Sequence, residues 1–531
     1  MRVASLFAGL SALALSASVP VADALNVAII STFGTRSDIA PIFEGLRDFA
    51  MVPGNKVTFI AAGKGLASGY ASNFKEYVET VVVDELELPE YLDTFIPQIM
   101  EKNLRIDNTA MFLDGINLIA DVYETNVQIF MEQFRKYKFD LVMCDAVEQS
   151  CMDAAKETKT KLTIYGPLGQ YGVGADWYVP DFLDPVSVGD WIASPWRRAK
   201  GYIDMIPFVF AMLQARSKII AAQAKLNMTM EYLEPWDYPQ RHMMLSHHVL
   251  GIDPARSVPT NIQVFGPIVH EANIPPLEPE FQVALDNFKA EGTRVVFIAF
   301  GTLLTFKKGH VLAEELLAGI ETLISDKERN VAVIWASRHH HHDMIAPLQA
   351  KYPGRLLTPT WVNQRRCLMH ESVKVMFSHA GYGSMSEALL EGKAQLMMPL
   401  VFDEFLNAHL AEEQGIALQM DKSTMTADEM ATKIQWLLDE TANPASEYSR
   451  TLQKWQTIGR LGNERAKVIV SNAVTLAATV GVDHLVPPDV KLSIFDRFAV
   501  GPMVLIFFAL RWLLSFACAS SRKTNTKTKT A

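Results

Sequence analysis

Residues 373–385 combine a strand pattern, a glycine-rich turn and the start of a helix pattern. Glycines between a strand and a helix let backbone N–H groups come close to an anion, and the helix N-terminus adds a partial positive charge. His379 can donate a hydrogen bond to a phosphate oxygen, and Ser384 can cap the helix while it contacts the same group. We therefore predict that this turn, which contains Gly381 and Gly383, holds a diphosphate.

The elements that must position this turn form two α/β halves. Short apolar runs alternate with helical stretches, and runs that are apolar throughout suit parallel strands covered on both faces. Each half should therefore be a doubly wound sheet that binds ligands at the carboxyl ends of its strands. The predicted strands are residues 26–31, 56–61, 80–83, 139–145 and 162–165 in the first half, and 294–300, 330–336, 373–378 and 395–399 in the second.

The chain divides at a connector rich in proline and glutamate, residues 267–282. We predict two facing Rossmann-like domains, residues 25–266 and residues 283–480, with ligands bound between them. Residues 171–225 interrupt the first half with tryptophans, basic residues and an apolar run. This insertion suits a membrane interface or an apolar acceptor pocket, and it equally suits an ordinary helical cover over the sheet.

Composition excludes several classes of protein. The chain has 531 residues, enough for two or three domains that each bury a core. Hydrophobic residues at 49% and charged residues at 20% exclude a disordered or fibrous protein, and four cysteines exclude a disulfide scaffold. A net charge of -10 has the wrong sign for a protein whose main partner is nucleic acid.

Both ends of the chain indicate a membrane protein. Residues 1–24 contain a basic residue, an apolar stretch and an A-x-A spacing, which predicts a cleaved signal peptide. Residues 498–519 are long and apolar enough to span a bilayer despite Arg511, although a hydrophobic hairpin lying on the membrane is the alternative. A juxtamembrane segment, residues 481–497, precedes this span, and the basic tail at 520–531 should lie in the cytosol.

Three short features suit a protein whose bulk is lumenal. The tail ends Lys527-Thr528-Lys529-Thr530-Ala531, which resembles the K-x-K-x-x retrieval signal of endoplasmic reticulum membrane proteins. Asn227 begins an N-glycosylation sequon, and Cys144 and Cys151 could pair in an oxidising lumen. We therefore predict a single-pass protein of the endoplasmic reticulum membrane.

The second half carries a longer pattern around the turn. It resembles the signature of the family 1 UDP-glycosyltransferases, and the terminal span with a basic tail resembles the membrane-bound members of that family. The resemblance implies the GT-B fold, a UDP-sugar as co-substrate, no further cofactor, and a hydrophobic small-molecule or lipid acceptor. The residues that carry it are Trp361-Val362-Asn363-Gln364, His370, the turn at 379–384, Glu387, Gly392, Pro399, Asp403-Glu404 and Asn407, with Phe300-Gly301-Thr302 upstream.

The resemblance also implies roles for these residues. Trp361 would stack on uracil, and Gln364 and Glu387 would bond the nucleoside. The donor sugar would face Asp403 and Glu404. The diphosphate would contact His379, Gly381, Gly383, Ser384 and Thr302. Taken one at a time, Trp361 could instead be a core aromatic and Glu387 an exposed helix charge.

The catalytic base is expected in the first half. Residues 33–41 resemble the G-T-R-G-D-x-x-P stretch of sterol and antibiotic glycosyltransferases, in which the aspartate occupies the place of the catalytic histidine of many relatives. Asp38 is therefore the candidate general base, with helix capping as its alternative role. Asp145 matches the aspartate that orients the histidine in those relatives, but this turn has no histidine to orient.

The implied mechanism is a direct displacement with inversion at the anomeric carbon. No D-x-D triplet occurs in the chain, so the helix dipole and N–H groups must neutralise the leaving UDP instead of a metal. The four histidines at 339–342 could bind a metal, but adjacent residues cannot all face one point. We predict no metal site.

Glu404 stands where the family usually has glutamine. An ionised carboxylate there can only accept hydrogen bonds and lies beside Asp403, so we expect a neutral hexose such as glucose rather than glucuronate. Two alternatives remain open, which are a pseudoenzyme that binds nucleotide sugars without turnover and a nucleotide-sugar epimerase of GT-B type.

Overall fold

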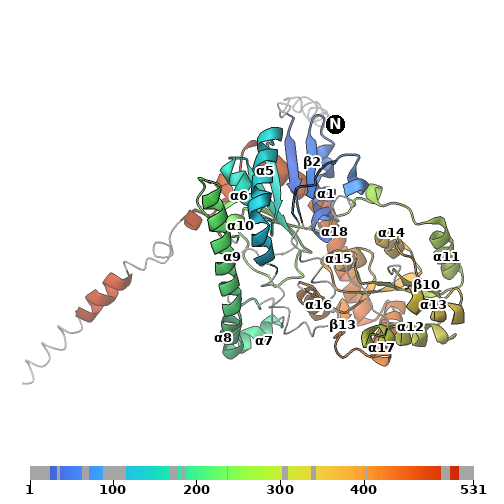
Figure 1. Ribbon diagram of the computed structural model, residues 1–531. Helices are drawn as coiled ribbons and strands as arrows, with labels where there is room; N and C mark the ends of the chain where they lie inside the picture. The colour runs from blue at the N-terminus through green and yellow to red at the C-terminus, as the bar shows by residue number, and fades with distance from the viewer. Residues whose placement is uncertain are drawn as a thin grey trace, which may run out of the picture.

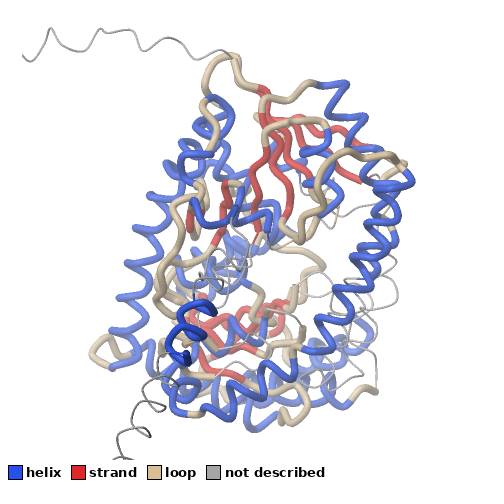
Figure 2. The backbone as a smooth tube through the Cα atoms, turned by 90° about the vertical axis from the view of Figure 1, so that its left-hand side faces the viewer, coloured by secondary structure: helices blue, strands red, loops and turns tan. Residues whose placement is uncertain are grey.

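The protein consists of two α/β domains that lie side by side, each with one parallel sheet covered by helices on both faces (Figures 1 and 2). This architecture confirms the predicted fold class. The computed structural model describes residues 24–32, 36–62, 71–87, 115, 117–166, 178–180, 186–235, 237–301, 309–336, 342–401, 403–491 and 503–512.

The first sheet has its strands in the order β3-β2-β1-β4-β5-β6-β7, and all its neighbours pair in parallel. Side chains alternate between the two faces, so Val27 and Ile29 join one hydrophobic cluster while Ala28 and Ile30 join another. The strands are β1 (Asn26–Ile30), β2 (Lys56–Ala62), β3 (Glu79–Val83), β4 (Leu141–Asp145), β5 (Leu162–Gly166), β6 (Met243–His247) and β7 (Ile262–Phe265).

Helices cover both faces of this sheet. They include four that fall between β5 and β6, and three of these lie within the predicted insertion at residues 171–225. The helices are α1 (Arg36–Ala50), α5 (Tyr123–Tyr137), α6 (Gln149–Glu157), α7 (Val188–Ala193), α8 (Pro195–Asp204), α9 (Ile206–Lys225) and α10 (Asp237–Arg241), with a 3-10 turn at Ser72–Phe74.

The second sheet has the order β10-β9-β8-β11-β12-β13 and is also parallel. Its strands are β8 (Arg294–Ala299), β9 (Val331–Trp335), β10 (Leu356–Leu357), β11 (Val373–Ser378), β12 (Ala394–Met397) and β13 (Ala417–Gln419). Its helices are α11 (Pro279–Ala290), α12 (Val311–Ser325), α13 (His342–Lys351), α14 (Gln364–Met369), α15 (Tyr382–Leu390), α16 (Glu404–Glu413), α17 (Ala427–Ala442) and α18 (Glu447–Thr479).

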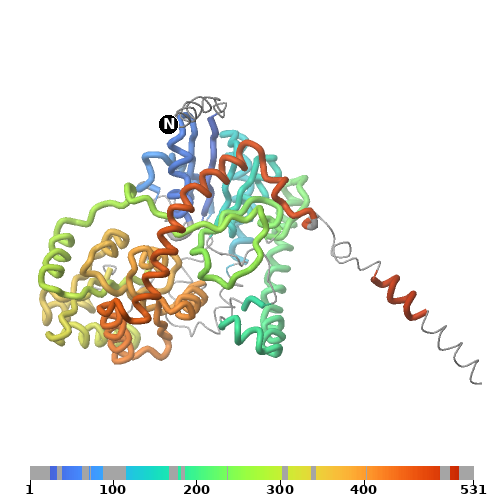
Figure 3. The backbone as a smooth tube through the Cα atoms, turned by 180° about the vertical axis from the view of Figure 1, so that it is seen from behind, coloured from blue at the N-terminus to red at the C-terminus, as the bar shows by residue number. Residues whose placement is uncertain are grey.

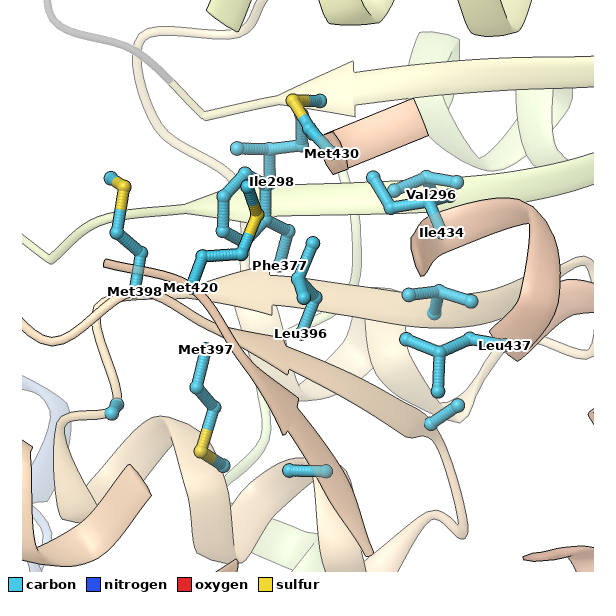
Figure 4. Packing of buried hydrophobic residues seen from close by; sticks show 14 of the residues in the cluster. Val296, Ile298, Phe377, Leu396, Met397, Met398, Met420, Met430, Ile434 and Leu437 are labelled. Atoms are coloured by element: carbon cyan, nitrogen blue, oxygen red, sulfur yellow. The ribbon is translucent and has the colours of Figure 1, made fainter. Parts of the chain in front are cut away.

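The core of the second domain forms where one face of its sheet meets α17. Figure 4 shows Ile298 and Phe377 from neighbouring strands packing with Met430 and Ile434 of the helix. All four side chains are buried. Burial of large apolar side chains contributes roughly 1.5–3 kcal/mol each, so this layer holds β8 and β11 rigidly beneath the turn at their carboxyl ends.

Helix α18 crosses from the second domain to the first (Figure 3). Its early residues Leu452 and Trp455 pack in the second core, whereas Val470 and Val474 pack in the first. A Cβ atom on Gly45 of α1 would lie 2.7 Å from Val470, so glycine permits this close contact. The end of the segment predicted as the second domain therefore belongs to the packing of the first.

Two further predictions meet the structure in different ways. The chain between β7 and α11 has a 3-10 turn at Glu271–Asn273, and α11 begins at Pro279, within the predicted linker. Cys144 at the end of β4 forms a disulfide with Cys151 of α6, with their Cα atoms 5.8 Å apart. The signal peptide and the cytosolic tail lie outside the described residues.

Candidate functional site

Two glycines close around His379 at the carboxyl edge of the second sheet. A Cβ atom on Gly381 would lie 2.5 Å from His379 Nε2, and one on Gly301 would lie 3.0 Å from it. Gly301 also has φ +72°, a conformation that glycine adopts without strain. Gly381 is the N-cap of α15, so the ring lies at the positive end of that helix. Larger residues at positions 301 and 381 would therefore collide with the His379 ring, and the glycines leave room around it.

His379 is held in its neutral form. Burial lowers the pKa of its imidazole to about 4. Its Nε2 atom lies 3.8 Å from Glu404 Oε1, and 17% of the side chain is exposed. At neutral pH the ring can therefore donate one hydrogen bond and accept another, and it brings no positive charge.

The side chains predicted to hold the nucleoside lie together. Gln364 Nε2 donates hydrogen bonds to Glu387 Oε2 at 2.8 Å and to Ser384 Oγ at 3.3 Å. Asn363 caps α14 by accepting the Arg366 N–H, and this cap fixes Gln364 as the first residue of the helix. The structure therefore joins α14 and α15 through the predicted residues.

One local expectation about Ser384 is wrong. The helix begins at Tyr382 rather than after Ser384, and Gly381 occupies the N-cap position. Ser384 is the third residue of α15 and does not cap it. The glycine cap gives no side-chain hydrogen bond, so the first N–H groups of the helix have no acceptor from the cap side chain.

Trp361 is 56% exposed, so it is not a core aromatic. It follows β10 and borders an open pocket of about 620 Å³. Both an aromatic surface and polar groups are available there. The lining residues are Glu278, Glu280, Phe281, Ala284, Gln349, Leu357, Thr358, Pro359, Thr360 and Trp361.

Asp403, which is half-buried, and Glu404, which is buried, lie at the start of α16. The Asn407 amide donates to Asp403 Oδ2 at 2.8 Å and to the Ala380 carbonyl at 3.1 Å, which ties this helix to the glycine turn. Glu404 Oε2 accepts the backbone N–H groups of Leu400 and Val401, each at 2.8 Å. The two acidic residues therefore border the same turn as His379.

The surroundings of Glu404 favour its protonated form, whereas the sequence predicts an ionised carboxylate. Burial, reinforced by the neighbouring Asp403, raises the pKa of the Glu404 carboxyl well above its usual range. Burial also raises the pKa of Asp403. A protonated Glu404 can donate a hydrogen bond as well as accept one, as a glutamine side chain does.

A second polar cluster lies at the carboxyl edge of the first sheet, between β1 and β4, where the strand order reverses. Ser31 Oγ donates to Asp145 Oδ2 at 2.9 Å, and the Val147 N–H donates to Asp145 Oδ1 at 3.2 Å. Asp145 is 3% exposed. It is therefore fixed at the position where α/β sheets bind ligands.

Glu148 was missed by sequence reasoning. Its carboxyl accepts hydrogen bonds from the hydroxyls of Thr32 and Ser150, and burial raises its pKa. The signal that could have found it is its place three residues after the end of β4, on the same edge as Asp145. It links the chain after β1 to the chain after β4.

Several predicted residues are placed only in part. Asp38 is the third residue of α1, so its backbone lies near the β1 and β4 edge, but its side chain falls outside the described part. Thr302 and the histidines at 339–341 also lie outside it.

The domains touch beside the glycine turn. His248, just after β6, stacks its ring on Tyr382 with centroids 4.6 Å apart, and its Nδ1 lies 2.7 Å from Asp253 Oδ2. Tyr382 is the first residue of α15 and is buried. None of these three residues was predicted, because the contact joins segments far apart in the sequence.

Two parallel sheets in two domains, with a glycine turn at the carboxyl edge of the second sheet and acidic residues at that of the first, are the arrangement expected of the GT-B fold. A model of the family described as "UDP-glucoronosyl and UDP-glucosyl transferase" matches residues 65–445. The chain therefore belongs to this family, and it is a UDP-glycosyltransferase.

Individual proteins agree with this assignment. The chain is 23% identical over 406 residues to a UDP-glycosyltransferase of Talaromyces amestolkiae, covering 70% of this chain and 74% of that protein. It is 24% identical over 196 residues to an ecdysteroid UDP-glucosyltransferase of Autographa californica nuclear polyhedrosis virus, covering 37% of each. The crystal structure of the glycotransferase of kitacinnamycin has a similar fold, with TM-score 0.59, 15% identity, and coverage of 85% of this chain and 99% of that one.

Proposed function

We propose that this enzyme transfers a neutral hexose, with glucose as the first candidate, from a UDP-sugar to a hydroxyl group of a hydrophobic or lipid acceptor. The observation that carries the proposal is the hydrogen-bonded set Gln364, Glu387 and Ser384 on α14 and α15, next to the glycine turn around His379. This set lies on two adjoining helices and offers acceptors for ribose hydroxyls and donors for phosphate oxygens.

The UDP-sugar would lie along the carboxyl edge of the second sheet. Trp361 would stack on uracil, Glu387 would accept the ribose hydroxyls, and the N-terminus of α15 would face the diphosphate. The neutral His379 would donate to a phosphate oxygen. As UDP leaves, the helix dipole and the N–H groups of the turn would stabilise its charge without a metal.

The acceptor hydroxyl would be activated from the first domain. Asp38 would remove its proton while the oxygen attacks the anomeric carbon and the bond from that carbon to UDP breaks, which inverts the configuration. Asp145, held by Ser31, would orient the groups around Asp38. Support for this arrangement is that β1 and β4 are neighbours, so both aspartates follow strands at one edge.

The sequence predicts a neutral hexose because of an ionised Glu404, whereas the structure supports the same preference through the burial of the acidic residues. Glu404 lies beside the neutral His379, and Lys422 is a cation close enough to interact with its carboxyl group. The carboxylate of a glucuronate would share this buried space with two acidic side chains, and placing a further charge there is costly. The name of the viral relative, an ecdysteroid UDP-glucosyltransferase, supports glucose and a steroid-like acceptor.

We also propose that the protein is a glycosylated, single-pass protein of the endoplasmic reticulum membrane, with its two domains in the lumen. The disulfide between Cys144 and Cys151 fits an oxidising compartment, and Asn227 is exposed just after α9. Of the predicted span, residues 503–512 are described, and they form an apolar helix.

The experiment is an incubation of the full-length protein with labelled UDP-glucose, UDP-galactose or UDP-glucuronate and a set of hydroxylated lipids and steroids. The proposal predicts a glycosylated product with a neutral donor. Release of UDP without any product, or conversion of the UDP-sugar into its epimer, would contradict it.

A further inference from the structure

Helices α8 and α9 form one long arm within the first domain. Residues Pro195–Lys225 are the one stretch, among the described helices, that is long and apolar enough to cross a membrane. The inner side of α9 is made mostly of small residues and packs against the domain. The buried residues of α9 are Ala211, Ala215, Ile219, Ala222 and Gln223.

The outer side of this arm carries many large apolar side chains, most densely over residues 202–213, whereas the exposed side of a helix on a soluble protein is usually polar. Trp196 is 86% exposed and Phe210 is 67% exposed. Contiguous exposed apolar surface of this kind marks an interaction site. The large apolar residues on this side, called here the outer face, are Trp196, Tyr202, Ile203, Ile206, Val209, Phe210, Leu213 and Ile220.

The arm cannot itself cross a bilayer, because polar contacts bind it to the domain. Gln223 Nε2 donates to the buried Asp153 at 2.9 Å and to the Tyr123 hydroxyl at 3.1 Å. Lys218 also pairs with Asp121 at 2.6 Å. Helix α9 is therefore held along the first domain, and only its outer face is available to a partner.

Charge and aromatic content indicate which partner fits. Arg197, Arg198 and Lys200 lie next to Trp196 at the start of the arm. Basic residues attract anionic lipid headgroups, and exposed tryptophan and tyrosine side chains suit the boundary between headgroups and acyl chains. A soluble protein partner would not require this combination.

A second exposed apolar helix lies toward the same side of the molecule. Residues Met503–Trp512 are all exposed. Figures 1 and 3 both place this helix on the side of the molecule that carries α8 and α9. A bilayer that receives the C-terminal helix would therefore lie near the outer face.

We propose that the outer face of α8 and α9 rests in the interface of a phospholipid bilayer that contains anionic lipids, as a second membrane contact of the first domain. The arm would lie parallel to the membrane rather than span it. The proposal rests on the proposed membrane location and does not depend on transferase activity. It would place the acceptor domain against the source of hydrophobic acceptors.

The test uses the full chain, with Cys518→Ser to remove one thiol outside the described domains, and a polarity-sensitive fluorophore on a single new cysteine. Phe210→Cys labels the outer face. Leu461→Cys on α18 is the matched control, because Leu461 is 68% exposed. Each protein is reconstituted with vesicles of phosphatidylcholine and phosphatidylserine, with and without spin-labelled lipids, and UDP binding verifies that each variant is folded.

We expect a blue shift and strong quenching by spin-labelled lipids for the probe at 210, and neither for the probe at 461. Equal, weak quenching at both positions in variants that bind UDP would overturn the proposal. A blue shift at 210 that occurs without vesicles and grows with protein concentration would also overturn it, because a second copy would then cover the outer face. Neither readout measures sugar transfer, so failure of the proposed function remains a separate result.

Discussion

Replacement of Glu387 by alanine should weaken UDP binding strongly. A carboxylate can accept several hydrogen bonds, so Glu387 can hold Gln364, which donates to it at 2.8 Å, together with ribose hydroxyls. Hydrogen bonds to a charged group contribute about 1.5–3 kcal/mol, so the dissociation constant of UDP should rise roughly 10- to 150-fold. Isothermal titration with UDP measures this without any acceptor.

Glu391→Ala is the matched control. Glu391 is the C-cap residue of α15, one turn after Glu387, and it pairs with Arg365 at 2.6 Å at the end of the helix away from the glycine turn. This variant should lose some stability and bind UDP as the unmodified protein does. Equal UDP affinity in Glu387→Ala and Glu391→Ala, with both proteins folded, would refute the assignment of Glu387 to the nucleoside.

Three further outcomes are expected. Trp361→Ala should weaken UDP by roughly 1–3 kcal/mol if the exposed indole stacks on uracil, and unchanged affinity in the same titration would remove it from the site. Because burial favours the protonated form of Glu404, Glu404→Gln should leave turnover of UDP-glucose nearly unchanged, and pH profiles of kcat/KM should show that the variant lacks the titration of this carboxyl group. Burial raises the pKa of Asp153 from 3.8 to about 6. A raised carboxyl pKa gives its full stabilising effect below the unfolded pKa, and this effect is lost as pH rises through the folded pKa. The free energy of unfolding relative to Asp153→Asn should therefore fall by about 2 kcal/mol between pH 4 and pH 7. Denaturant unfolding of both proteins at each pH measures this. The same difference in the free energy of unfolding at pH 4 and at pH 7 would contradict the prediction.

The central parallel strands could be predicted because short runs that are apolar throughout are typical of strands buried on both faces. The predicted strand at 373–378 is β11, and the one at 26–31 contains β1. Strands β6 and β7 were missed because Ser246, His247 and Gln263 interrupt their apolar pattern, although β6 is buried throughout. Strands β10 and β13, of two and three residues, are too short to give a pattern.

Properties that depend on distant contacts could not be predicted. The apolar positions of α18 show a helix, but nothing local shows that Trp455 packs in one domain and Val470 in the other. The sequence shows a glutamate at position 404, but the rise in the pKa of this side chain comes from its burial beside Asp403 in the folded protein. The stacking of His248 on Tyr382 likewise exists only after the two domains meet.

Metal-independent inverting transfer is tested most directly by incubating the enzyme with UDP-glucose and a hydroxylated steroid in the presence of EDTA. The anomeric configuration of the product is then determined by NMR. The account predicts a β-glucoside from the α-linked donor, and a fall in turnover of ~100-fold or more in Asp38→Asn with UDP affinity unchanged. An α-glucoside, a requirement for added metal, or nearly full turnover in Asp38→Asn would contradict metal-independent inverting transfer with Asp38 as the base.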